Sequence, residues 1–332
     1  MLRTVPLSVS FLFLILVSVF SAPADPEKGG APGVIDTQAP VMGSDLVIAN
    51  TNSSTSTALS LTLTWGSASD NVTPTERIAY KVVMGLAATD VSTTTKANAL
   101  TGPAVVMDWT MSVATTTFST GLSPHTNYWF AVVTKDAVGN LALSKVTLYT
   151  PVAADTMVRM DGSNATNGFG GKDTLFIKNS TVNARVPYLR FDLASVSGAS
   201  VTKALLQFAV YRDASTAAAN QTVSVTGLTA SASQTWIEGT TNGTPAGPGE
   251  LTWATQPTEM GTVLDSTTIT DSVGTTPTYV TLDLTKFVNG QLAVGNKVFT
   301  LKFTGNLAVS TLMGILSKES IGLRAPFLTI TH

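Results

Sequence analysis

The sequence contains no cysteine and only two histidines, His125 and His332, among its 332 residues. The lack of cysteine excludes disulfide bonds, a thiolate nucleophile and a cysteine-ligated metal ion. Two histidines leave little material for a Ser-His-Asp triad or for a metal centre held by several histidines. The composition therefore disfavours most classes of enzyme.

Charged residues are scarce as well. Asp, Glu, Lys and Arg make up 12% of the chain, and 19 basic against 21 acidic residues give a formal net charge of −2. Soluble domains usually contain about 25% of these residues. Because no basic field is available to attract phosphate groups, nucleic acid is not an expected partner.

Threonine, by contrast, is abundant, with 53 residues beside 26 glycines and 15 prolines. Threonine is β-branched and suits the half-exposed surface of a pleated sheet, while glycine and proline mark turns. The composition predicts an all-β protein with many turns. No segment after residue 24 shows a helical period over a useful length.

The first 24 residues are typical of a secretory signal peptide. Arg3 precedes an apolar run from Leu7 to Phe20 that is short for a membrane span, and Ala22 and Ala24 fit a cleavage site after residue 24. We expect a secreted, extracellular, monomeric protein with no membrane span after cleavage; the alternative is a retained anchor. Residues 25–36, rich in glycine, proline and charge, predict a flexible linker.

Short alternating segments begin after residue 37. Leu59–Trp65 places leucines and the tryptophan on one face, and residues 80–84 and 128–134 are further strand candidates separated by turn residues. Several short strands at this spacing predict a β-sandwich over residues 37–151.

These residues resemble a fibronectin type III domain. Trp65 stands where that family has its strand-B tryptophan, the string from Leu122 to Tyr128 matches a Leu-x-Pro-x-Thr-x-Tyr turn, and residues 136–140 resemble a hairpin of bacterial members. The resemblance implies a tyrosine corner at Tyr128. Residues 87–110 are interpreted as an insertion, and its Trp109 is expected to pack rather than to bind a ligand.

Residues 152–332 are interpreted as a second all-β unit. Alternation over residues 188–193, 204–211, 279–285 and 298–303 places apolar side chains on one face of each strand. Eight or more strands over this length predict a jelly-roll sandwich. The fold expected for the chain is thus all-β, a fibronectin type III-like sandwich followed by a jelly roll.

Five strings in this second unit resemble one family. They are ADTMVR at 154–159, YLRFDL at 188–193, TWIEG at 235–239 with LTW at 251–253, LDLT at 282–285, and SKES at 317–320 with PFL at 326–328. Together they resemble the DNRLRE domain, which is related to the disaggregatase repeat and to family ninety-six carbohydrate-binding modules. The resemblance implies a jelly-roll carbohydrate binder, with relatives linked to acidic polysaccharides such as alginate.

The candidate glycan-binding residues lie at strand positions opposite the apolar ones, with a tryptophan added from a loop. Aromatic rings can stack on sugar rings, glutamine can bond hydroxyls, and arginine can hold a carboxylate bidentately. The alternatives are core packing for Trp236 and Trp253, and a solvated surface with cross-strand pairs such as Arg190 with Asp283. The candidates are Tyr188, Arg190, Gln207, Tyr211, Tyr279, Lys302 and Trp253.

The oxygen-rich loop 161–168 suggests a structural calcium ion, since calcium prefers oxygen ligands. The alternative is a set of Asx turns that hold the loop. No other cofactor is expected. The candidate ligands are Asp155, Asp161, Asn167 and Glu319.

The sequence thus predicts a secreted, non-catalytic protein that binds a polysaccharide or cell-surface glycan through residues 152–332. One alternative is an adhesive or structural surface protein that binds another protein, and another is an accessory part of a polysaccharide-degrading lyase system. A glycosidase needs two carboxylates about 5 to 10 Å apart across a cleft. Glu238 has no second carboxylate tied to it by the sequence, so no enzymatic activity is expected.

Overall fold

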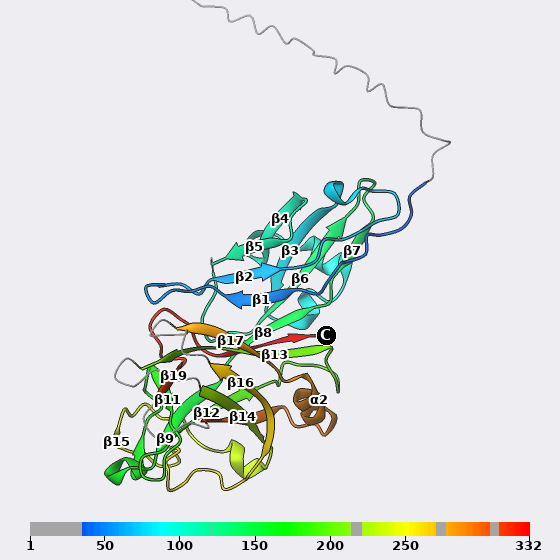
Figure 1. Ribbon diagram of the computed structural model, residues 1–332. Helices are drawn as coiled ribbons and strands as arrows, with labels where there is room; N and C mark the ends of the chain where they lie inside the picture. The colour runs from blue at the N-terminus through cyan, green and yellow to red at the C-terminus, as the bar shows by residue number, and fades with distance from the viewer. Residues whose placement is uncertain (1–34, 120, 214–220, 270–276, 306–311) are drawn as a thin grey trace, which may run out of the picture. The chain divides into compact units, whose positions relative to one another are not determined.

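The computed structural model describes residues 35–119, 121–213, 221–269, 277–305 and 312–332 (Figure 1). The predicted signal peptide, 1–24, and residues 25–34 of the predicted linker lie outside the described residues. Residues 37–332 form one compact unit whose regular secondary structure is mostly strands. The prediction of an all-β fold is confirmed.

The N-terminal part of this unit is a sandwich. A small sheet, in the order β1 (Val47–Asn50), β2 (Leu61–Thr64) and β5 (Thr115–Phe118), packs on strands β3 (Ala79–Gly85), β4 (Val105–Met111), β6 (Tyr128–Lys135), β7 (Leu141–Leu143) and β8 (Thr147–Pro151). Alternate residues point inward, as the sequence predicted. The core between the layers includes Ile48, Leu61, Leu63, Trp65, Tyr80, Val82, Phe130 and Val132.

Two expectations for this sandwich can be checked directly. Trp65 is buried in the core, as expected. The backbone N–H of Ser123 donates to the Tyr128 hydroxyl at 2.7 Å, which is the hydrogen bond expected of a tyrosine corner. Trp109 on β4 is partly buried against the core, and the Lys135 ammonium lies 4.1 Å from the centroid of its ring, so packing accounts for it.

The C-terminal part is a second sandwich. One layer, here called the distal sheet, has the order β16 (Thr262–Ile269), β14 (Gln221–Leu228), β18 (Val298–Gly305), β12 (Arg185–Asp192) and β9 (Ala154–Arg159). The facing layer contains β11 (Thr174–Ile177), β19 (Met313–Leu316), β13 (Lys203–Arg212), β17 (Thr278–Asp283) and β20 (Phe327–Thr331). Short strands β10 (Asn167–Gly168) and β15 (Thr244–Pro245) pair outside both layers.

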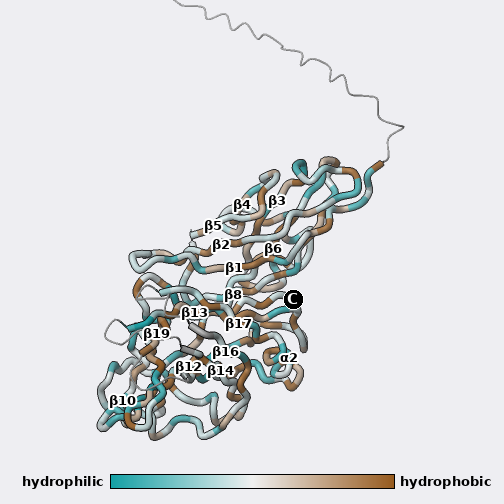
Figure 2. The backbone as a smooth tube through the Cα atoms, in the orientation of Figure 1, coloured by the Kyte–Doolittle hydropathy of each residue, from teal (hydrophilic) through white to brown (hydrophobic). Residues whose placement is uncertain are grey.

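The core of this second sandwich is rich in phenylalanine. Phe208 and Phe303 meet edge to face from opposite layers, with ring centroids 5.3 Å apart. Phe191 and Phe299, on neighbouring strands, point into the same core. The alternation that predicted these inward positions is confirmed. Figure 2 shows hydrophobic stretches along many of the strands.

The two sandwiches share a sheet. Strand β20 pairs with β13 on one side and with β8 on the other, so among the described residues ten strands join into one layer, here called the long sheet. The register places Ile330 opposite Leu148. The predicted division at residues 151 and 152 therefore falls within one hydrogen-bonded sheet, and two separately folding domains stay a prediction.

Short helices interrupt the strands, although no segment after residue 24 shows a helical period over a useful length. Helix α1 (Thr94–Ala99) is capped by the Thr93 hydroxyl, which accepts from the N–H of Lys96. Helix α2 (Thr285–Ala293) buries Val288 and Leu292, four residues apart. Both are too short to show a period in the sequence. Single 3-10 turns occur at η1 (Thr75–Arg77), η2 (Ala88–Asp90), η3 (Gly102–Ala104), η4 (Gly162–Thr166) and η5 (Ser231–Gln234). None of the helices within the described ranges has the length and apolar character to cross a membrane.

Candidate functional site

A groove of about 930 Å³ lies over the outer face of the distal sheet. Strands β12 and β18 form its floor through Val186, Lys302 and Thr304. Its walls are segment 253–260 and the connection 178–185 between β11 and β12. This volume lies in the usual range of ligand-binding pockets.

Two of the predicted glycan-binding residues, Trp253 and Lys302, line this groove. Trp253 is partly buried, and its carbonyl oxygen accepts a hydrogen bond from the Gln256 side chain at 3.1 Å. Lys302 lies on β18 between Tyr188 and Thr226 of the neighbouring strands. No hydrogen bond or ion pair joins its ammonium to another described residue, and burial lowers the pKa of Lys302. A partly desolvated cation and an indole ring therefore both line the groove.

Two further cations at the groove, Lys178 and Arg185, were missed by the sequence analysis. Their backbones bond each other in both directions at 3.0 Å across the ends of the 178–185 connection. The alternating pattern of apolar residues ends where a strand ends, so it gives no information about residues at the ends of a connection between two strands. The available signal was a pair of cations flanking a polar turn. The Arg185 guanidinium lies 5.5 Å from the Phe176 ring centroid, and its Nε has no hydrogen-bond partner among the described residues.

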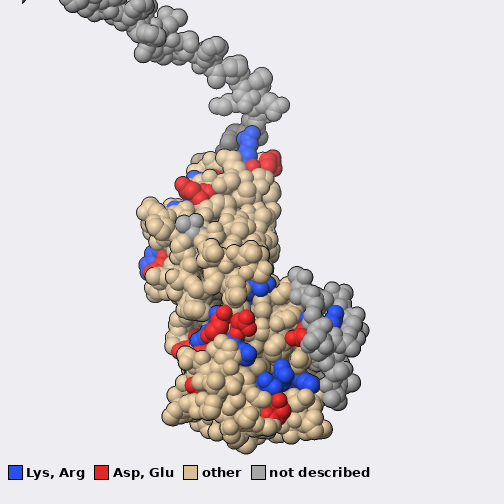
Figure 3. Space-filling view, turned by 90° about the vertical axis from the view of Figure 1, so that its left-hand side faces the viewer, with Lys and Arg blue, Asp and Glu red and all other residues tan. Residues whose placement is uncertain are grey.

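Glu259 is the carboxylate that lines the groove, and its oxygens are already engaged. It accepts hydrogen bonds from the N–H groups of Thr229 and Ala230 and from the Ser233 hydroxyl, at 2.8, 3.1 and 2.7 Å. Burial acts to raise the pKa of Glu259, but these hydrogen bonds outweigh it and lower the pKa. The lining that remains for a ligand is cationic. On the face drawn in Figure 3, basic and acidic side chains lie in a few groups on a mostly uncharged surface.

Tyr188 does not face solvent, so that part of the prediction is wrong. Its side chain is fully buried in a small cluster with Trp236 and Leu251, because segment 228–256 folds over this part of the distal sheet. The Tyr188 hydroxyl donates to Oε1 of Gln256 at 2.9 Å. Since the same amide donates to the Trp253 carbonyl, Tyr188 supports the groove wall from beneath.

Arg190 is also occupied by this overlying segment. One guanidinium nitrogen donates to the carbonyl oxygens of Gln234 and Trp236, at 3.0 and 2.5 Å, and the guanidinium lies 4.8 Å from the Trp236 ring centroid. Trp236 itself is buried, as the core alternative expected. The pair of Arg190 with Asp283 that was considered does not form, because Arg190 lies opposite Thr300 and Asp283 lies opposite Leu205.

The remaining candidates lie on the long sheet, away from the groove. Gln207 is buried, contrary to expectation, and its amide donates to the Ile48 carbonyl at 2.7 Å because the N-terminal sandwich covers that face. Tyr279 packs against the same N-terminal core. Tyr211 donates to the Thr174 hydroxyl at 3.2 Å. The seven candidates therefore do not form one surface.

The predicted calcium ligands also separate into two places. Asp155 and Glu319 lie together with Glu238, with one carboxylate oxygen of each within 4.8 Å of the others. Burial, followed by the charges of Glu319 and Glu238, raises the pKa of Asp155 well above its usual range. Asp161 instead forms an ion pair with Arg159 at 2.7 Å. Asn167 donates to the Gly243 carbonyl at 2.9 Å, a contact between distant segments and not an Asx turn.

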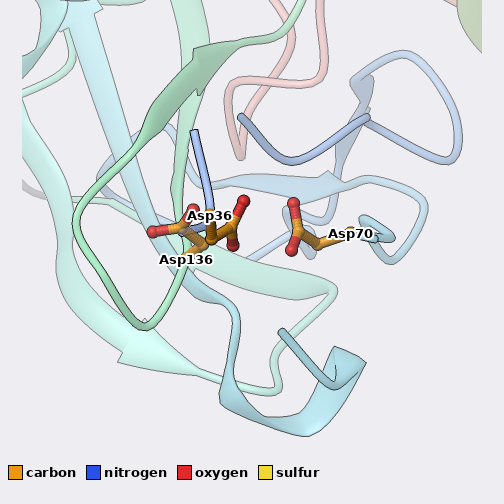
Figure 4. Close-up of side chains that lie close together, drawn as sticks. All are labelled: Asp36, Asp70 and Asp136. Carbon is orange, nitrogen blue, oxygen red and sulfur yellow. The ribbon is translucent and has the colours of Figure 1, made fainter. Parts of the chain in front are cut away.

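The N-terminal sandwich has carboxylates of its own. Figure 4 draws Asp70, Asp136 and Asp36. A carboxylate oxygen of Asp70 and one of Asp136 lie within 4.8 Å of each other. Asp36 belongs to the separate unit of residues 1–36. One oxygen of Asp136 accepts from the N–H groups of residues 138–140, and one oxygen of Asp70 accepts from those of residues 72 and 73. These hydrogen bonds hold two turns.

Comparison with solved structures finds only distant likenesses. They include a promiscuous carbohydrate-binding module of the β-sandwich superfamily (11% identity, TM-score 0.21, 89% of this chain and 97% of that chain). They also include a xylan-binding module of family 15 (11% identity, TM-score 0.25, 57% of this chain and 97% of that chain). A third is a surface glycan-binding protein from Prevotella bryantii (10% identity, TM-score 0.27, 89% of this chain and 77% of that chain). Such low TM-scores carry no argument. No curated protein sequence matches the chain.

The family comparison is more informative. The model of carbohydrate-binding module family 96 matches residues 146–332, from the residue before β8 through all strands of the second sandwich. This stretch contains the groove with Trp253 and Lys302 and the group of Asp155, Glu238 and Glu319. Because the match covers more than half of the 332 residues, the chain belongs to carbohydrate-binding module family 96, and the partner of this module is a carbohydrate.

Proposed function

We propose that the groove on the distal sheet binds an acidic polysaccharide. The observation that carries this proposal is the Lys302 ammonium, which is partly buried, has no acidic partner among the described residues and lies in the same groove as Trp253. Leaving a cation partly desolvated costs free energy that an anionic ligand would recover. A polymer with one carboxylate on each sugar ring supplies both the charge and the apolar ring face.

The groove residues divide the recognition between them. The Trp253 indole stacks on a sugar ring, while Lys178, Arg185 and Lys302 pair with ligand carboxylates from the opposite wall and the floor. Gln256 already bonds Tyr188 and the Trp253 carbonyl, so it positions the indole.

The same groove supports a non-catalytic role. Glu259 is the carboxylate among its described lining residues, and that group is held by the 229–233 backbone and Ser233. A hydrolase needs a second carboxylate across the cleft. We therefore assign the protein a polysaccharide-binding role without catalysis. We place it outside the cell because the sequence predicts a signal peptide.

A titration tests this proposal. The full-length protein is titrated with alginate and with a neutral xylan at low and at high salt. We expect tight binding to alginate that weakens with salt, since exposed charges are screened within about 8 Å at physiological ionic strength. Lys302→Ala removes a charged hydrogen bond worth roughly 1.5–3 kcal/mol, so affinity should fall about 10- to 150-fold. Trp253→Ala should cost at least roughly tenfold.

Matched controls come from the N-terminal sandwich. Lys145 is exposed and pairs with Asp45 at 3.2 Å, so Lys145→Ala should leave affinity unchanged, as should Trp109→Ala. Equal, salt-insensitive binding of both polymers would contradict the proposal, as would unchanged affinity in folded Lys302→Ala and Trp253→Ala. Release of reducing ends or unsaturated uronates by the pure protein would contradict the non-catalytic role.

A further inference from the structure

Three carboxylates from distant segments meet at one edge of the second sandwich. Asp155 begins β9, Glu238 lies in the loop after η5, and Glu319 follows β19. One oxygen from each lies within 4.8 Å of the others. Like charges at this separation repel unless a cation lies between them.

Asp155 is the most unusual member of this carboxylate group. It is fully buried, and its Oδ2 accepts from the N–H of Lys318 at 2.8 Å. Its Oδ1 is buried as well and has no hydrogen-bond partner among the described residues. A buried carboxylate oxygen without a donor costs free energy, and native structures normally give such an atom a donor or a metal ion. The unsatisfied oxygen belongs to the carboxylate that the other two surround.

The charges nearby do not balance. Lys318 contacts Glu238 through its ammonium, which lies 3.9 Å from an oxygen of Glu319. Three carboxylates and one ammonium leave a formal charge of −2 in this group. Arg190 and His125 also interact with Glu238. The Arg190 guanidinium donates to the carbonyls of residues 234 and 236 and keeps its positive charge, so a formal charge of −1 remains even when Arg190 is counted. A bound cation would offset this remaining negative charge.

We infer that Asp155, Glu238 and Glu319 form a calcium site. All three ligands are carboxylate oxygens, and this donor set suits a hard cation and not a soft one. The buried Oδ1 of Asp155 gains a partner, and Glu238 and Glu319 supply the outer oxygens. Glu238 replaces Asp161 and Asn167 of the sequence-based proposal, which are engaged with Arg159 and Gly243.

This site would join three parts of the chain that strand pairing alone does not join. Glu238 belongs to the segment that folds over the distal sheet and continues to Trp253 and the groove wall. Its Oε1 accepts from the N–H of Asp155 at 2.9 Å, so the segment is already fixed at this point. A cation bound here therefore holds the start of the segment that leads from Glu238 to the groove wall against β9 and against the turn at 317–320.

Calcium binding to the full-length protein tests the inference directly. Protein freed of metal with EDTA is titrated with calcium chloride by isothermal titration calorimetry, and its melting is followed with and without the ion. We expect saturable binding and a rise in melting temperature of about 5 °C at saturating calcium. Glu319→Gln, at an exposed position, should weaken calcium binding at least roughly tenfold. Glu238→Gln combined with Glu319→Gln should abolish it.

Control variants identify the location of the ion. Asp161→Asn removes another carboxylate of the same sandwich, and Asp136→Asn removes one from the N-terminal sandwich, so both should keep wild-type calcium affinity. The inference is overturned if the wild type takes up no calcium, which would leave Lys318 as the cation of the group. It is equally overturned if the folded double variant retains calcium, or if Asp161→Asn or Asp136→Asn loses it.

Discussion

Charged side chains in this protein serve mainly to hold its own backbone. Glu259 accepts from Thr229, Ala230 and Ser233, Arg190 donates to two carbonyls of the 234–236 segment, and Asp136 caps a turn. With only 12% charged residues, few remain for other roles. Lys302 is an exception, since no described acid pairs with it, and this difference is the basis of the proposal that the groove binds a ligand.

Glu259 gives a pH prediction. Its folded-state pKa is lowered by hydrogen bonds that outweigh burial, so its stabilising effect is present above the unfolded pKa near 4.5 and is lost as pH falls through the folded value. Glu259→Gln should lower the free energy of unfolding at pH 7 by roughly 1 kcal/mol, because solvent screens a partly exposed group. Denaturant unfolding from pH 3 to 7 measures this. The wild type and variant should converge at acid pH, and a constant difference between them at every pH would refute the assignment.

Strands and their core faces were predictable because alternation is a local property. Leu189 and Phe191 on β12, and Phe299, Leu301 and Phe303 on β18, all point into the core as expected. What covers the opposite face was not predictable, because it depends on segments far away in the sequence. Tyr188 is covered by residues about 50 positions later and Gln207 by β1, about 160 positions earlier. The groove could be identified only once the cover over Tyr188 was known.

The covering loop also depends on glycines whose role the sequence does not reveal. The loop backbone near Glu238 packs directly against residues 168–171, where Gly171 donates to the Thr241 carbonyl at 2.9 Å. A Cβ at Gly170 would overlap the carbonyl oxygen of Glu238, and one at Gly171 would overlap that of Thr240. Such close backbone approach is possible only without a side chain.

Gly170→Ala should therefore displace the loop that carries Glu238. We expect a loss of about 1–3 kcal/mol in the free energy of unfolding, because a backbone oxygen cannot rotate away as a side chain can. Gly290→Ala in α2 is the matched control: nothing lies within 4 Å of its Cβ, and alanine favours a helix by up to about 1 kcal/mol. Denaturant unfolding of both variants measures the difference. Equal stability of the two would show that the loop tolerates the side chain.

At the scale of the whole chain, the long sheet joins the second sandwich to the N-terminal sandwich. Strand β20 is paired on one side by β13 of the second sandwich and on the other by β8, which also pairs with β6 of the N-terminal sandwich. The family match starts at residue 146 and so includes β8, whereas the predicted boundary between residues 151 and 152 excludes it. Because β8 pairs with β20, strand pairing also favours a second sandwich that begins with β8.

Two fragments test where the binding module begins. Fragment 146–332 keeps β8 paired along β20 from Thr147 to Pro151, whereas fragment 152–332 leaves that edge of β20 unpaired and open to association with other chains. Fragment 146–332 exposes only the shorter edge of β8 that pairs with β6, at residues 147–149, so we expect it to associate less than fragment 152–332. It should also be more stable in denaturant by a few kcal/mol, since each lost net hydrogen bond costs about 1 kcal/mol. Size-exclusion chromatography and denaturant unfolding measure both properties.

The groove residues lie between positions 160 and 305, so fragment 146–332 should bind alginate with the affinity of the full chain. Equal stability of the two fragments would mean that β8 belongs to the N-terminal sandwich alone, and weaker binding by a folded 146–332 would mean that residues before 146 contribute to the site.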